Sequence, residues 1–151
     1  MRRTGTVCPR PRPGRGVACP IMTDLAAVWT ALPEDVRAEL IAEPDVVPAG
    51  RIALLAKHGV PVVSVAWEGQ PHDRWEVTGE FHVFVLERAL EDRERRYHAL
   101  MDPLVEAGKV PLSVLDRPGP APLTVEQAHE LTMLRNEARD LAARLGRPAS
   151  V

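Results

Sequence analysis

Proton-transfer chemistry needs histidines and carboxylates that a fold brings together, and the sequence offers few such pairs. His72 precedes Asp73 in a turn-forming segment, and Glu76 and Glu80 lie four positions apart. Such pairs act as general acid and base when they converge. None of the five histidines belongs to a His-x-x-x-His or His-Glu-x-x-His metal pattern. We therefore predict no catalytic, metal-binding or cofactor-binding residues.

Nucleophilic catalysis has no better support. None of the three serines lies in a Gly-x-Ser-x-Gly turn. Both cysteines, Cys8 and Cys19, fall within the first 21 residues, so the rest of the chain has no thiol for a disulfide, a metal or catalysis. No glycine-rich loop precedes a predicted helix as a phosphate-binding loop would. The sequence predicts that the protein is not an enzyme and binds no cofactor.

The sequence best indicates the burial of apolar surface against a partner, through residues near the C-terminus. Apolar residues there recur at spacings of three and four, which is typical of one face of a helix: Leu131, Leu134, Ala138, Leu141 and Leu145. Burying one leucine contributes about 1.5–3 kcal/mol. We expect these residues to bind a protein partner, a second copy of the chain in a homodimer being the favoured one. Packing within a monomer is the alternative.

Phosphate binding is the competing hypothesis. Arg51, Lys57 and His58 fall on the third predicted helix, and Arg74 lies at the tip of a predicted hairpin. A DNA-binding surface needs a basic stripe on such elements. Residues 22–80 instead hold four Lys/Arg against ten Asp/Glu, a net charge of -6. DNA binding through these four residues is therefore the alternative, ranked below a protein partner.

The elements that position these residues follow from apolar periodicity and from the prolines and glycines that interrupt it. Valines dominate residues 60–67, as in a strand, and Trp75 and Val77 alternate as in a returning strand. Helices are expected over three short stretches within residues 24–58, over residues 80–101 and over residues 124–145. The last helix has Thr124 and Gln127 at the two positions of a capping box. The sequence thus predicts a mostly helical α+β fold.

The order of these elements resembles that of a winged helix over about residues 24–101. An N-terminal trihelical unit is followed by a small hairpin with a long tip and by a long helix. The resemblance implies that the third helix would enter the major groove of DNA and that residues 68–74 would form the wing. It is a likeness of order and has no motif of its own.

The long helix over residues 80–101 has its own apolar seam, which a single charge interrupts. The seam residues again step by three and four, as in heptads: Val83, Leu86, Leu90, Arg93, Tyr97 and Leu100. Arg93 weakens a coiled-coil interpretation. We expect this helix to pack inside the core of a monomer.

Charge and composition divide the chain into four parts. Residues 1–21 hold five arginines, four prolines and no acid, and are expected to be a disordered basic tail. They suit a nucleic-acid-binding arm, although Met22 is an alternative start of the protein. A globular domain is predicted over residues 22–115, a stiff proline-rich linker over 116–123 and an amphipathic, separate C-terminal helix over 124–147.

Together these features predict a small acidic interaction or regulatory protein. Residues 22–151 carry a net charge of -7, which favours protein partners over nucleic acid. No apolar run approaches the about 20 residues of a membrane-spanning helix. We expect a cytoplasmic, non-enzymatic module that self-associates or binds a partner through its heptad-like helices. The alternative is a winged-helix-type DNA-binding transcriptional regulator.

Overall fold

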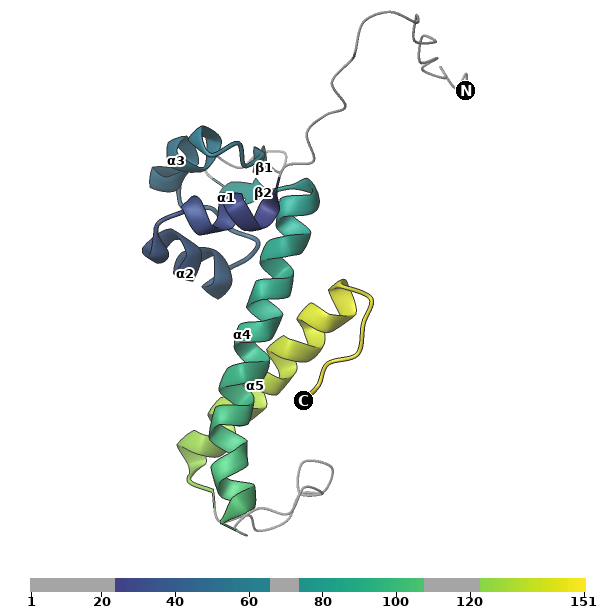
Figure 1. The fold of residues 1–151 in the computed structure, drawn as a ribbon. Helices are drawn as coiled ribbons and strands as arrows, with labels where there is room; N and C mark the ends of the chain where they lie inside the picture. The colour runs from purple at the N-terminus through teal and green to yellow at the C-terminus, as the bar shows by residue number, and fades with distance from the viewer. Residues whose placement is uncertain (1–23, 66–73, 108–122) are drawn as a thin grey trace, which may run out of the picture.

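The computed structural model describes residues 24–65, 74–107 and 123–151. One long helix, α4 (Gly79–Glu106), forms the spine of the molecule. Three short helices and a small hairpin gather at its N-terminal end, and α5 (Val125–Arg144) lies along its other half (Figure 1). The described part is therefore mostly helical with one small antiparallel sheet, as predicted.

Local capping explains the three short helices. In α1 (Leu25–Ala31), the carboxylate of Asp24 accepts hydrogen bonds from the backbone N–H groups of Ala26 and Ala27. Two acidic residues occupy the first turn of α2 (Glu34–Ala42), where the positive end of the helix dipole favours them. A 3-10 turn (Ala49–Arg51) leads into α3 (Ile52–Lys57). Gly59 follows with φ of 76°, a conformation that glycine adopts readily after a helix.

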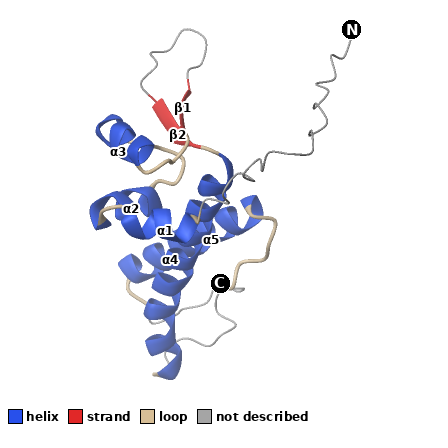
Figure 2. Cartoon of the chain, turned by 45° about the horizontal axis from the view of Figure 1, so that its top comes forward, coloured by secondary structure: helices blue, strands red, loops and turns tan. Residues whose placement is uncertain are grey.

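The sheet pairs β1 (Val62–Val65) with β2 (Arg74–Val77) in antiparallel register, with Val62 opposite Val77 (Figure 2). A single bridge joins Val47, from the α2–α3 connection, to Trp75 on the other side of β2. β1 begins two residues later than predicted, and β2 includes Arg74 as well as the predicted Trp75, Glu76 and Val77. Of the predicted hairpin tip, residues 68–73, including His72, lie outside the described residues, and Arg74 belongs to β2.

The first core sits where the three helices and the hairpin meet the start of α4. Its buried members come from the end of α1, from α2, α3 and the segments that follow them, from β2 and from α4: Leu32, Val36, Leu40, Val47, Leu55, Val60, Val77, Phe81 and Val85. Trp29 packs against this core, with its ring 5.8 Å from that of Phe84. The N-terminal part of α4 therefore belongs to this core. Further along, α4 buries a different face, which packs against α5.

Two details of α4 differ from the sequence prediction. The helix continues through Pro103 to Glu106, whereas it was predicted over residues 80–101. Val83 was expected in the buried seam, yet it is exposed, and Phe81 and Val85 are buried instead. The seam fails there because this part of α4 packs against the hairpin and the short helices, which approach it from another side than α5.

The C-terminal helix is not separate. Thr124 and Gln127 form the predicted capping box, and α5 then packs along α4 in two clusters. One cluster joins Leu86, Ala89 and Leu90 to Ala138, Leu141 and Ala142, and the other joins Tyr97 and Met101 to Leu131 and Leu134. The proline-rich linker predicted a separate C-terminal helix. Instead, α4 and α5 each have an apolar stripe, and the two stripes are buried against one another.

The described chain has the predicted order of helices and strands, but this order alone does not define a winged helix. The tail over residues 1–21 and most of the linker over 116–123 lie outside the described residues. Among the helices that the structure describes, none is long and apolar enough to span a bilayer.

Candidate functional site

An arginine-lined groove lies between α2 and α4, beside the end of α1. It has a volume of about 580 Å³ and is open to solvent on one side. Its charged lining comes from four arginines and two acids: Arg37, Arg93, Arg95, Arg96, Glu34 and Asp92. These side chains carry a net charge of +2 on a chain whose residues 22–151 carry -7. We call this feature the arginine groove.

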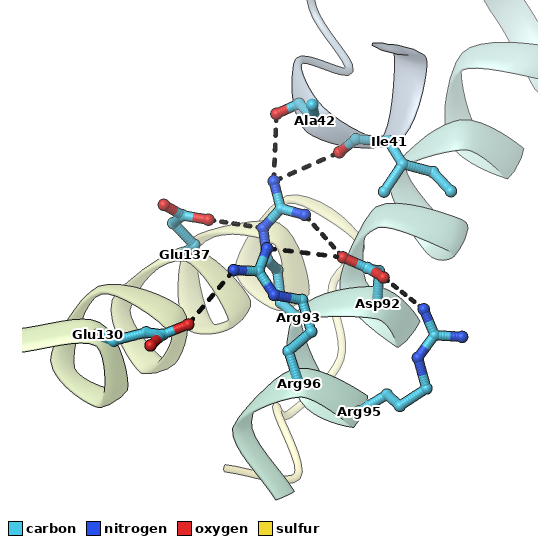
Figure 3. Close-up of polar contacts among 8 residues, drawn as sticks. All are labelled: Ile41, Ala42, Asp92, Arg93, Arg95, Arg96, Glu130 and Glu137. Carbon is cyan, nitrogen blue, oxygen red and sulfur yellow. Dashed lines mark hydrogen bonds and ion pairs between the residues drawn. The ribbon is translucent and has the colours of Figure 1, made fainter. Parts of the chain in front are cut away.

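Arg93 forms the floor of the arginine groove and is only 8% exposed. Its Nε donates to Oε2 of Glu137 on α5 at 2.6 Å, and its Nη1 donates to Oδ2 of Asp92 at 3.1 Å (Figure 3). Its Nη2 donates to the backbone oxygens of Ala42 at 3.1 Å and Ile41 at 3.4 Å. The guanidinium therefore caps the negative end of α2 while joining it to α4 and α5.

The same residue explains why the predicted seam of α4 is interrupted. A buried charge is tolerated when it is paired and hydrogen-bonded, and Arg93 has partners on three helices. The sequence alone marked Arg93 as a defect, because its partners Glu137 and the end of α2 are about 40 and 50 positions away. A charge within an otherwise apolar seam was the signal that pointed to a buried polar junction.

Arg95 and Arg96 form one wall of the arginine groove. Arg95 pairs with Oδ1 of Asp92, and Arg96 lies 4.0 Å from Oδ2 of the same carboxylate. Arg96 also lies 3.6 Å from Glu130 on α5. Three guanidinium groups thus meet at Asp92, which is largely covered, so donors exceed acceptors on this wall.

Arg37 faces them from α2. Its Nε is buried and has no hydrogen-bond partner among the residues that the structure describes. A buried N–H without a partner carries a cost of about 1–3 kcal/mol. Trp29, Ala38 and Ile41 complete the lining with apolar surface. The arginine groove therefore combines an unsatisfied cationic donor with an apolar strip.

A second polar cluster fixes the other end of α5 to the N-terminal part of the chain. Asp45, in the α2–α3 connection, accepts hydrogen bonds from both terminal nitrogens of Arg144, and its Oδ1 lies 3.1 Å from Nε2 of His82. The hydrogen bond from Arg144 lowers the pKa of Asp45, and partial burial opposes this effect. The cluster is half-exposed and serves as a tie between α4, α5 and the loop.

This tie predicts a pH-dependent contribution to stability. A carboxyl group with a lowered folded pKa stabilises the fold above its unfolded pKa, about 3.9, and the contribution is lost as the pH falls through the folded value. We expect Asp45→Asn to lower the free energy of unfolding by no more than about 1 kcal/mol at pH 7 and by less at pH 3. Urea denaturation across this range measures it. Asp102→Asn, at an exposed site of α4, is the control, and an Asp45→Asn effect independent of pH would contradict the assignment.

The five partner-binding residues predicted on α5 do come together on one face. Leu131, Leu134, Ala138 and Leu141 are buried, and Leu145 packs against the cluster that holds Ala138 and Leu141. The surface that covers them is α4 of the same chain. Contact with a second copy through these residues stays a prediction, and it requires α5 to leave α4.

The four residues of the DNA-binding alternative do not form a free basic stripe. Arg51 donates from Nε to Glu39 at 2.9 Å and from Nη2 to Asp35 at 2.6 Å. The hydrogen bond from Arg51 lowers the pKa of Glu39, consistent with a tight pair. The remaining residues add little, because Arg74 lies 3.2 Å from Glu76 and only Lys57 and His58 follow on α3.

The candidate acid/base groups are not assembled in the described chain. His72 lies outside the described residues, Glu76 pairs with Arg74, and Glu80 borders a small apolar cavity beside Leu25 and Phe81. Within residues 24–65, 74–107 and 123–151, no group of three His, Cys, Asp or Glu side chains is placed to hold a metal ion.

Comparison with known proteins adds no family to this description. No protein-family model matches the chain, and neither curated proteins nor solved structures give a significant match. The arginine groove must therefore be interpreted from its own residues.

Proposed function

We propose that the protein is a non-enzymatic interaction module that binds a protein partner through the arginine groove. The observation that carries the proposal is the placement of Arg37, Arg95 and Arg96 around one open groove whose floor, Arg93, is locked by bonds to three helices. Arg93 fixes the packing beneath the groove, and the positive charge of the lining favours a partner of complementary charge.

The homodimer expected from the α5 leucines has a stricter requirement. Those leucines are covered, so a dimer that uses them must exchange α5 between two copies, as in domain swapping. The arginine groove needs no such opening. We therefore place partner binding at the groove and keep helix exchange as the second route to association.

A winged-helix-type DNA-binding regulator remains the alternative. It has less support, because Arg51 and Arg74 are already paired with carboxylates and the chain outside the groove is acidic. Phosphate contacts would have to displace these internal pairs.

Site-specific photo-crosslinking tests the proposal. A photoreactive amino acid replaces Ala38, an exposed residue of the groove lining, or Met133 on the exposed face of α5, so that every arginine is kept. Each protein is irradiated in an extract of its source cells, and we expect a discrete polypeptide adduct at position 38 that is absent at position 133. A ladder of nucleic-acid adducts at 38, the same adducts at both positions, or no adduct would each contradict a protein-binding groove.

A further inference from the structure

We propose that the partner segment in the arginine groove is a short acidic amphipathic peptide. One carboxylate would pair with Arg37, a second would bind Arg95 or Arg96, and an apolar side chain would pack on Trp29 and Ile41. This inference rests on the proposed function and gives its ligand a chemical class.

The case for a carboxylate begins at Arg37. Its Nε is buried without a hydrogen-bond partner among the described residues, although Arg37 lines an open groove. The Arg37 side chain as a whole is half-buried, so an incoming carboxylate would pair with its guanidinium from the groove, a stronger contact than a neutral hydrogen bond. Among the described residues, Glu34, the other acid of the lining besides Asp92, forms no ion pair with Arg37.

The case for a second carboxylate lies across the groove. Asp92 accepts from Arg93 through Oδ2 and from Arg95 through Oδ1, and Arg96 reaches it only at 4.0 Å. Each guanidinium has five N–H donors, whereas one carboxylate offers about four acceptor positions. Glu130 lies 3.6 Å from Arg96, so it competes only weakly for that side chain. Donors on this wall are therefore available to a ligand.

The apolar part of the lining favours a peptide over other anions. Trp29, Ala38 and Ile41 contribute apolar surface to a groove of about 580 Å³ that is open rather than enclosed. A few side chains of a helical or extended segment fit such a volume. Polyphosphates and nucleic acid would leave the apolar strip unused, and a long polyanion would meet the net charge of -7 carried by residues 22–151.

The experiment titrates a fluorescein-labelled 15-residue peptide of glutamate and leucine at helical spacing against the full-length protein, with anisotropy as readout. Comparison probes are the same peptide with lysine for glutamate, the same peptide with serine for leucine, and a 20-base-pair DNA duplex. We expect the acidic amphipathic peptide to bind best, with an affinity that falls as salt rises. Binding of the DNA or the lysine peptide as tightly as the acidic peptide would overturn the inference, and so would equal binding of the serine peptide.

Protein variants test whether the peptide binds at the arginine groove. Arg37→Gln should weaken binding about tenfold, the value expected for one charge-assisted hydrogen bond. Arg95→Glu, at a side chain that is 77% exposed, tests the opposite wall without threatening the fold. Lys57→Gln removes one positive charge from α3, away from the groove, and should leave binding unchanged. Equal effects of all three variants, or none from the groove variants, would overturn the assignment. A crosslinked protein at position 38 without peptide binding would reject this ligand class and leave the proposed function standing.

Discussion

Leu134→Asp is expected to lower the free energy of unfolding by at least about 4 kcal/mol, the largest effect of any single change proposed. Leu134 is 3% exposed and packs with Leu131, Tyr97 and Met101 where α5 meets α4. Truncation of a buried leucine alone costs about 2–5 kcal/mol, and a buried carboxylate without a partner adds a desolvation cost. We expect α5 to separate from α4 or the protein to unfold at lower urea concentration.

Urea denaturation followed by far-ultraviolet circular dichroism measures the effect, and Met133→Asp is the matched control. Met133 is the preceding residue of the same helix and is 46% exposed, so its substitution should change stability by less than about 0.5 kcal/mol. Equal losses for the two variants would contradict the packing of α5. Because Leu134 is buried within one chain, loss of stability does not reveal a dimer. Light scattering of the unmodified protein over a concentration series is needed for that question.

Arg93→Met is expected to lower the free energy of unfolding by about 3 kcal/mol. Methionine keeps an unbranched apolar side chain in the same space, so the change mainly removes the guanidinium. The carbonyls of Ile41 and Ala42 then lose their donor, and the partly buried Asp92 loses one of its cations. Removing one partner from a buried ion pair costs about 3–5 kcal/mol, and Glu137, which is 42% exposed, recovers part of this by hydration.

The control for Arg93→Met is Arg95→Met, two residues further along α4 on the groove wall. Arg95 pairs with the same Asp92 but is exposed, and exposed pairs contribute about 0–1 kcal/mol. Thermal denaturation of both variants should separate a structural arginine from one free to bind a partner. A larger loss for Arg95→Met than for Arg93→Met would mean that the buried junction does not hold α2, α4 and α5 together.

Local signals account for the parts of the fold that were predicted well. Asp24 caps α1, Thr124 and Gln127 cap α5, and Gly59 ends α3, because each of these motifs works through backbone groups within four residues. The five apolar positions of α5 were also placed correctly on one face. Periodicity determines which face of a helix is buried, and it does not determine what buries it.

The groove could not be predicted for the same reason. Arg37 on one helix and Arg95 and Arg96 on another are nearly 60 positions apart, and nothing in their local sequence relates them. Basic residues were instead sought on α3 and the hairpin, by analogy of element order. The structure places carboxylates against two of those, Arg51 and Arg74, and places the available arginines between α2 and α4.

By itself the sequence determined a helical chain with an acidic body, the caps of α1 and α5, the apolar face of α5 and the part of the α4 face that follows Val83. These features depend on composition and on contacts within a turn or two. Only the tertiary structure decided that α5 lies on α4 of the same chain, that Arg93 is a junction rather than a defect, and that three arginines surround one groove. These features depend on side chains 30 or more residues apart, and only the packing of the folded chain brings them together.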